Sequence, residues 1–194
     1  MVISKGSSYG EEAHADPQRP VCDDDVALAN HIERHGLQQC TVTAGDILRT
    51  LGGGAPSGVA AQAYPVDVLD VQADGERFVA SAHVVARHRL WRGTFLAAMN
   101  AAYVEGLYLG PRSHPNDGLV DVTTGSLRWQ QRIMARRRAE TGTHLPHPDM
   151  KMVRRPKYEI TFDQPMPLYI DGVAVGRFGW LAIEVRPDAG VVVV

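Results

Sequence analysis

Two apolar stretches joined by a turn signal decide the fold: VDVLDVQADG at residues 66–75 and FVASAHVV at residues 78–85. Apolar and polar side chains roughly alternate in the first stretch, which is typical of a β-strand with one buried face. Asp74-Gly75 is a common hairpin turn because glycine readily adopts the positive φ that a tight turn requires. The two stretches therefore predict an antiparallel β-hairpin.

Short stretches of the same kind continue to the C-terminus, separated by Gly, Pro and Asp-Gly turns. One long helix over about 126–139 interrupts them, and two helical turns are expected within 88–100. Many short strands with such turns are typical of an antiparallel β-sandwich or barrel, and we assign a β-sandwich domain to residues 59–194. Within it we expect strands at 101–109, 119–124, 149–155, 157–163, 167–171 and 180–186.

Toward the N-terminus the apolar spacing changes from that of strands to that of helices. It predicts a helix at 25–35, a short strand at 41–43 and a second helix at 45–51 that ends at three glycines. Residues 21–58 would thus form a small α/β segment in front of the mainly β domain. Residues 1–20 show no apolar period, and we expect them to be a flexible leader outside the fold.

Composition and charge exclude several classes of protein. The 194 residues suffice for one compact body, and 44% hydrophobic residues with a net charge of -2 exclude wholesale disorder. No apolar run approaches the ~20 residues of a membrane-spanning helix, so we expect a cytoplasmic protein. Two cysteines, Cys22 and Cys40, cannot build a disulfide framework. No strand face interleaves aromatic and basic residues, so no nucleic-acid partner is expected.

Basic residues concentrate between positions 126 and 160. This region has nine basic side chains against Glu140, Asp149 and Glu159. Two interpretations remain open: an ordinary solvated face, which is the commoner case, and a contact with phosphate or with the anionic headgroups of a membrane surface. A peripheral membrane contact is therefore one expectation for this chain.

Three motifs in the second half of the chain resemble the diacylglycerol and sphingosine kinases, a family of lipid kinases. They are PRSHPNDGLVDV at 111–122, GTHLPHPD at 142–149 and YIDG at 169–172. In the first half, GDILRTLG at 45–52 resembles the family segment G-N-D-x-A-R-x-L-G, and CDDDV at 22–26 stands where the family has its G-G-D-G-T phosphate loop. The resemblance implies an N-terminal nucleotide domain followed by a C-terminal β-sandwich that holds lipid.

Three departures from this family concern its chemistry. A phosphate loop needs glycines so that backbone amides can approach the anion, whereas three carboxylates at 23–25 would repel a triphosphate. In the family, a Glu regarded as the general base follows the Asp-Gly pair, whereas here Asp171-Gly172 is followed by Val173, which cannot take a proton. Only 21 residues precede the loop position, so we expect a truncated nucleotide domain.

Two functions from different classes remain. The leading hypothesis is a degenerate lipid-kinase-like protein, a pseudokinase, that has lost ATP-dependent phosphoryl transfer. It would use the cleft of the β-sandwich to bind or transform a hydrophobic small molecule or lipid, for example in specialised metabolism. The alternative is an active diacylglycerol or sphingoid lipid kinase that a partner chain completes with the missing strands.

The candidate site residues come from the three motifs. The candidate catalytic groups are Asp171, Asp117 and His144, because carboxylates and imidazoles can move protons near neutral pH once burial shifts their pKa. We expect the pocket between the sandwich and the α/β segment, near Asp171, the turn at Asp117 and the segment 144–149. The candidate ligand-binding residues are Arg112, His114, His147 and Asp149.

The resemblance also places a structural magnesium ion at His114, Asp117 and Leu119. An imidazole is a poor ligand for so hard an ion, so the favoured alternative is an Asn-Asp-Gly turn in which Asp117 accepts a hydrogen bond from its own backbone. The two histidines and the aspartate of segment 144–149 have a spacing that could suit zinc, but a fourth ligand is missing. No other cofactor is expected.

The C-terminal residues AGVVVV, at 189–194, are apolar and β-prone, so we expect a neighbouring strand to cover them. The strands missing from the α/β segment would leave apolar surface exposed there. A homodimer is an economical way to bury such a surface, and we expect the chain to form one.

Overall fold

The computed structural model describes residues 9–14, 16–54, 60–140 and 148–194. Within these ranges the α-helices are α1 (Asp25–His35), α2 (Asp46–Thr50) and α3 (Trp129–Ala139). The described part of the main sheet holds 11 strands. They are β1 (Glu11–Glu12), β2 (Val21–Cys22), β3 (Cys40–Val42), β4 (Gln62–Ala73), β5 (Glu76–Ala80), β6 (His83–Arg87), β7 (Thr94–Met99), β10 (Val120–Ser126), β11 (Met150–Arg155), β12 (Lys157–Ile170) and β13 (Val173–Val193). A separate hairpin pairs β8 (Tyr103–Val104) with β9 (Leu107–Tyr108).

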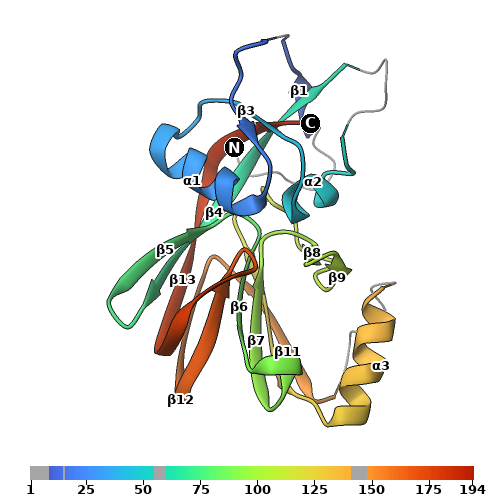
Figure 1. Cartoon of the computed structure of the whole chain (residues 1–194), viewed down its shortest axis with the longest axis vertical. Helices are drawn as coiled ribbons and strands as arrows, with labels where there is room; N and C mark the ends of the chain where they lie inside the picture. Colours follow the sequence, from blue (N-terminus) through green and yellow to red (C-terminus); the bar gives the residue numbers. More distant parts are fainter. Residues whose placement is uncertain (1–8, 15, 55–59, 141–147) are drawn as a thin grey trace.

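The strand order is β1-β4-β13-β12-β6-β7-β10-β11, with β5 paired to β4 and β3 paired to both β2 and β13. The pairings of β3 with β2 and with β13 are parallel, and the other pairings of the described strands are antiparallel. The long strands β4 and β13 run from the end of the molecule that carries α1 and α2 into the sandwich (Figure 1). The predicted mainly β, antiparallel sandwich with a small N-terminal α/β part is therefore confirmed.

The hairpin predicted at Asp74-Gly75 is formed by β4 and β5, with Ala73 opposite Glu76. Asp74 has φ 44° and Gly75 has φ 92°, the positive values that the tight turn requires. The Asp74 carboxylate also accepts hydrogen bonds from the backbone N–H groups of Gly179 (2.6 Å) and Trp180 (2.9 Å). This turn therefore fixes the hairpin to β13 as well as reversing the chain.

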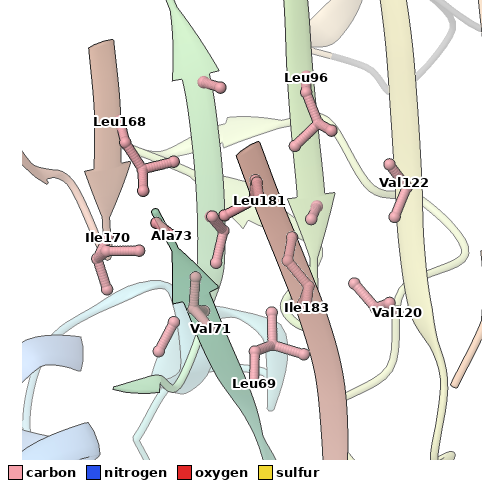
Figure 2. Packing of buried hydrophobic residues seen from close by; sticks show 14 of the residues in the cluster. Leu69, Val71, Ala73, Leu96, Val120, Val122, Leu168, Ile170, Leu181 and Ile183 are labelled. Carbon is pink, nitrogen blue, oxygen red and sulfur yellow. The ribbon is translucent and has the colours of Figure 1, made fainter. Parts of the chain in front are cut away.

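The main core fills the inside of the sandwich. Because side chains alternate along a strand, each strand contributes one face to it. Burying a large apolar side chain here contributes roughly 1.5–3 kcal/mol to stability. Figure 2 shows Leu69, Val71 and Ala73 of β4, Leu96 of β7, Val120 and Val122 of β10, Leu168 and Ile170 of β12, and Leu181 and Ile183 of β13.

A second core lies under α1, where Leu28 and Ile32 are buried with Val66 and Val192. Asp24 begins the helix, because its carboxylate accepts a hydrogen bond from the N–H of Ala27 (2.6 Å). The helix packs closely on β13, since a Cβ at Gly190 would lie only 2.5 Å from Ile32 Cγ1.

The C-terminal strand is covered on both sides. Val192 and Val193 pair with β4 on one side, opposite Tyr64 and Ala63, and with β3 on the other. The expectation that the apolar segment 189–194 would not remain an exposed edge is confirmed for these residues.

Two segments of the sandwich differ from the sequence-based expectation. The residues of β7 were expected to form helical turns, but Phe95, Leu96 and Ala97 are all buried, and a strand buried on both faces shows no alternation. Only the 3₁₀ turn Arg89–Trp91 within 88–100 is helical. Elsewhere, the expected strand at 101–109 is the tight hairpin of β8 and β9.

The two strands expected at 157–163 and 167–171 form one strand, β12, with an irregular register between Thr161 and Met166. Prolines within this stretch suggested an interruption, and the strand absorbs them where its pairing with β13 is irregular. The strand expected at 180–186 is likewise longer, because β13 extends over Val173–Val193.

Part of the expected leader belongs to the fold. Glu11 and Glu12 form β1 and pair with the start of β4. Tyr9 donates a hydrogen bond from its hydroxyl to the carbonyl of Pro65 (2.9 Å), and its ring lies against those of Tyr64 and His114. The expectation that residues 1–20 lie outside the fold is therefore wrong for this part of the segment, which Tyr9 and β1 attach to β4.

Helix α3 lies beside the sandwich, away from α1 and α2 (Figure 1). Ala139 is its one fully buried residue, whereas the side chains of Trp129 and Met134 are 64% and 51% exposed. A short helix is marginally stable unless it packs against the rest of the protein. Because most of α3 is exposed, its contacts with the sandwich contribute little to its stability. None of the helices in the described ranges is long and apolar enough to cross a membrane.

Candidate functional site

An apolar pocket of about 430 Å³ lies between α3, the 3₁₀ turn Arg89–Trp91 and strands β7 and β10; we call it the α3 pocket. Small-molecule sites typically measure ~300–1,000 Å³ and are mostly apolar, so its size and lining fit such a site. Three aromatic rings line it, those of Trp91, Phe95 and Trp129. The other apolar lining residues are Leu90, Ala97, Met99, Leu107, Leu109, Leu127, Ile133, Ala135 and Met150.

The periodicity of two elements explains how side chains reach the α3 pocket. Phe95, Ala97 and Met99 are two positions apart on β7 and therefore share one face, opposite the face that enters the main core. Trp129 and Ile133 are four positions apart on α3 and lie on one side of the helix. The sheet thus provides the floor of the pocket and the helix provides its cover.

Polar contacts of Gln131 and Arg132 hold α3 over this pocket. Gln131 accepts a hydrogen bond from the N–H of Arg128 (2.8 Å) at the start of the helix and donates one to Asp149 Oδ2 (2.6 Å). Arg132 Nη1 donates to the carbonyl of Leu90 (3.1 Å), which ties the helix to the 3₁₀ turn. The predicted ligand-binding residue Asp149 therefore helps to position α3, and it does not line the pocket.

A buried polar cluster lies where the α/β part meets the sandwich; it consists of Asp25, Asp46, Ser81, His83 and Asp171, and we call it the polar joint. Asp25 Oδ2 accepts a hydrogen bond from the N–H of Asp46 (2.6 Å) and Asp25 Oδ1 from the N–H of Ile47 (3.1 Å). Asp25 therefore caps the start of α2 with both oxygens.

Asp171, a predicted catalytic residue, holds the turn between β5 and β6. Its Oδ2 accepts a hydrogen bond from the N–H of Ser81 (2.8 Å), and its Oδ1 accepts from the N–H groups of Ala82 and His83 (both 2.9 Å). Burial raises the pKa of Asp171, and these amides offset only part of that effect. The carboxylate is therefore occupied by backbone donors.

The ionic pair of the polar joint is formed by His83 and Asp46. Asp46 Oδ2 lies 3.3 Å from His83 Nε2 and also accepts a hydrogen bond from the N–H of Glu105 (2.7 Å). Burial lowers the pKa of His83, but the hydrogen bond to Asp46 and the charge of Asp171 outweigh it and raise that pKa above its ordinary value. Burial raises the pKa of Asp25 to about 6, although the N–H groups of α2 oppose the shift.

A second pocket, of about 330 Å³, lies between α1 and β5, and Asp171 is one of its lining residues. Asn30, Glu33 and Arg77 are among its lining residues, and Arg77 Nη1 lies 2.7 Å from Glu33 Oε1. We expected the apolar pocket at this joint. A pocket does lie at this joint, and most of its lining residues are apolar, but it also holds charged side chains and the more apolar pocket lies under α3.

Asp117, another predicted catalytic residue, forms the turn that its sequence favours. Its Oδ1 accepts a hydrogen bond from the N–H of Leu119 (3.0 Å), and its Oδ2 pairs with Arg154. Burial raises the pKa of Asp117, and the Arg154 guanidinium opposes this shift. Both oxygens are therefore engaged within the protein.

The side chains suggested for magnesium are engaged with other groups of the protein. The Asp117 carboxylate is engaged with Leu119 and Arg154, and His114 Nδ1 accepts a hydrogen bond from the N–H of Asn116 (3.2 Å). The side chains of the described ranges form no group of three or more His, Cys, Asp or Glu suited to hold a metal ion. His114 is half-buried against Tyr9, and Arg112 is exposed; neither lines the α3 pocket.

Three residues remain to be compared with the predictions from the sequence: the predicted site residues His144 and His147, and Asp67, which was not predicted. His144 and His147 fall outside the described residues. Asp67, which was not predicted, is fully buried; it accepts hydrogen bonds from the N–H groups of Gly118 (2.8 Å) and Asp188 (2.8 Å). Its one signal in the sequence is that it is a carboxylate inside the apolar run of β4, which also contains Asp70. It fixes the Asn-Asp-Gly turn to β4 and β13.

Three solved structures from Bacillus anthracis str. Sterne, each assigned as a diacylglycerol kinase, have a similar fold. One has 14% sequence identity and a TM-score of 0.62, with 89% of this chain and 75% of that chain covered. Another has 12% identity and a TM-score of 0.62, with coverages of 89% and 76%. A third has 14% identity and a TM-score of 0.52, with coverages of 79% and 66%. At these identities the matches show the fold alone.

No curated protein matches the chain. Residues 59–194, which are well over half of the chain, match a family described as the YegS C-terminal NAD kinase beta sandwich-like domain. The chain belongs to this family, and the resemblance of its motifs to the lipid kinases is confirmed at the level of family and fold.

Proposed function

We propose that this lipid-kinase-like protein binds a hydrophobic small molecule in the α3 pocket and does not transfer phosphate from ATP. The observation that carries the proposal is the pocket itself, which is open to the surface, about 430 Å³ in volume and lined mainly by apolar and aromatic side chains. Each CH₂ group that a ligand buries there contributes roughly 0.8 kcal/mol. The apolar lining is therefore sufficient to bind a hydrophobic ligand without any reaction.

The weak packing of α3 supports this proposal. The helix covers the pocket, yet only Ala139 of its residues is fully buried, and Trp129 and Ile133 remain exposed at the pocket mouth. A hydrophobic molecule between α3 and β7 would give these side chains the apolar contacts that a core helix normally has. Ligand binding and the packing of α3 are thus expected to reinforce each other.

The position of the family's phosphate loop supports the loss of phosphoryl transfer. Helix N-termini bind phosphate through free backbone N–H groups. Here the carboxylate of Asp24 accepts from the first turn of α1, and that of Asp25 accepts from the first turn of α2. Two carboxylates thus occupy the amides that would otherwise face an anion, and their charge would repel ATP. At the position of the family's general base, Val173 has no group that takes a proton.

The test is calorimetric titration of the full chain with dodecanol, below its solubility limit, and separately with Mg-ATP. We expect micromolar affinity for dodecanol and no binding of ATP at millimolar concentration. Ala135→Phe fills the pocket from its helical side and should weaken dodecanol binding by at least about tenfold, about 1.4 kcal/mol. Gln130→Phe adds the same ring to α3 at a position that does not line the pocket, and should leave the affinity unchanged.

Two results would contradict the proposal. If dodecanol does not bind, or if Ala135→Phe and Gln130→Phe have the same effect, the α3 pocket is not the ligand site. If Mg-ATP binds with micromolar affinity and its phosphate is transferred to a lipid hydroxyl, the chain is an active lipid kinase.

A further inference from the structure

The α3 pocket carries positive charge as well as apolar surface. Arg92, Arg132 and Arg136 line it, and no acidic side chain of the described residues does. We propose that its ligand is an anionic amphiphile, with the alkyl chain in the pocket and a carboxylate or phosphate group at these arginines. This inference rests on the proposed function and adds the chemical class of the ligand.

Arg132 is the arginine that the structure holds in place. Its Nη1 donates to the carbonyl of Leu90 (3.1 Å), so the guanidinium is fixed against the 3₁₀ turn at the edge of the pocket. Its Nε is buried and, within the described residues, has no hydrogen-bond partner. A guanidinium has five N–H donors, so Arg132 keeps donors for an anion. A buried donor without a partner is costly, and an anionic group nearby would lower that cost.

Arg92 and Arg136 supply charge that the described part of the chain does not neutralise. Among the described residues, no acidic side chain forms an ion pair with either of them. In contrast, Arg77 and Arg186, on the sheet next to α1, both pair with Glu33 (each 2.7 Å). The positive charge at the α3 pocket is therefore available to a ligand.

The spacing of the arginines on α3 also favours an anionic ligand. Arg132 and Arg136 are four positions apart, so their like charges face each other on one side of the helix and destabilise it. An anion placed between them would convert this repulsion into attraction. Because the neighbouring pocket wall is apolar, the attraction would be stronger than that of a fully solvated ion pair.

The experiment compares three ligands of equal chain length, dodecanoate, dodecanol and dodecylamine. Dodecanol is titrated into the full chain below its solubility limit, and the two charged ligands below their micellar concentrations. We expect dodecanoate to bind at least about tenfold more tightly than dodecanol, which is the size of one hydrogen bond to a charged group, and dodecylamine to bind most weakly. Arg136→Gln and Arg92→Gln should each reduce dodecanoate affinity by about tenfold and reduce dodecanol affinity much less, because dodecanol has no charge that these arginines would attract. Arg137→Gln is the matched control, because Arg137 is exposed on the same helix and does not line the pocket.

The outcomes separate this inference from the proposed function. Equal affinities for the three ligands, or equal effects of Arg136→Gln and Arg137→Gln, would overturn the anionic class while dodecanol binding would keep the hydrophobic site. If none of the three ligands binds, the proposed function itself is contradicted.

Vesicles of phosphatidylglycerol and of phosphatidylcholine distinguish the source of the anion. Binding to the former alone, lost in Arg136→Gln, would assign it to a membrane lipid, and binding of monomeric dodecanoate would assign it to a free amphiphile.

Discussion

The carboxylates of the polar joint and the arginines of the α3 pocket differ in how completely they are partnered. In the polar joint, the carboxylates of Asp25, Asp46 and Asp171 all accept hydrogen bonds from backbone amides. In the α3 pocket, apolar side chains face an open space and Arg92 and Arg136 pair with no acidic residue among those described. Polar groups that the chain satisfies itself hold the structure together, whereas groups left without partners are free to meet a ligand.

This comparison bears on the roles of the aspartates in the family motifs. Asp171 and Asp117 stand in the motifs that resemble the lipid kinases, and both became catalytic candidates for that reason. Their oxygens instead hold the β5–β6 turn and the Asn-Asp-Gly turn. We infer that these motifs persist in this chain because they hold its turns in place. The first prediction below tests this inference most strongly.

Replacing Asp171 with Asn should have the largest effect on stability. Asn preserves the size of the side chain but replaces one acceptor oxygen by an NH₂ group that faces backbone donors, so we expect a loss of about 4 kcal/mol. Urea unfolding measures this loss. Asp163→Asn, at an exposed position on β12, the strand that ends just before Asp171, is the control and should change stability by less than about 0.5 kcal/mol. If the two variants are equally stable, Asp171 does not hold the turn.

The pH dependence of stability should reveal Asp25. Its pKa in the folded state is about 6, raised from 3.8, so folding favours its protonated form. The associated stability is fully present below the unfolded pKa and is lost as the pH rises through about 6, by on the order of 3 kcal/mol. Urea unfolding across this window should show the loss in the natural chain and a flatter profile in Asp25→Asn. Equal slopes in the two proteins would contradict the assignment.

Replacing Gly45 with Ala should destabilise the polar joint by about 2 kcal/mol. Gly45 has φ 110°, and an added Cβ would meet the Asp25 carboxylate that caps α2. Gly54→Ala is the control, because nothing lies within 4 Å of a Cβ at that position. Thermal unfolding compares the two variants, and similar melting temperatures would show that the close approach of Gly45 to Asp25 is unimportant.

Replacing Trp129 with Ala should have the smallest effect on stability, about 0.5 kcal/mol or less, because the side chain is 64% exposed. The same variant should weaken dodecanol binding several-fold, since the ring lines the α3 pocket. Urea unfolding and calorimetry measure the two quantities on one sample. A large loss of stability with unchanged dodecanol binding would show that Trp129 belongs to the core and not to the ligand site.

Much of the fold could be predicted from local signals. The hairpin at Asp74-Gly75 and the helix that begins at Asp25 follow from turn and capping chemistry within a few residues. β7 could not be predicted, because burial on both faces removes the alternation that marks a strand. β1 could not be predicted either, since a strand of two glutamates carries no apolar pattern and depends on its pairing with β4.

The candidate site was harder to predict than the fold. The α3 pocket is built from segments near residues 90–99, 107–109, 127–136 and 150, which only the sheet topology brings together. The excess of basic residues at 126–160 was visible in the sequence, but its relation to an apolar pocket was not. The roles of Asp171 and Asp117 depend on backbone donors far away in the chain or on an ion pair, and no motif records these.

Hydrogen exchange with and without dodecanol tests the central claim, that α3 covers a ligand site while the carboxylates of the polar joint already have backbone donors. Without ligand, we expect the amides of α3 to exchange rapidly and those of Ile47 and His83, which donate to buried carboxylates, to be protected. Dodecanol should slow exchange in α3 and leave the polar joint unchanged. Exchange in α3 that does not respond to dodecanol, or that slows equally in the polar joint, would contradict the account.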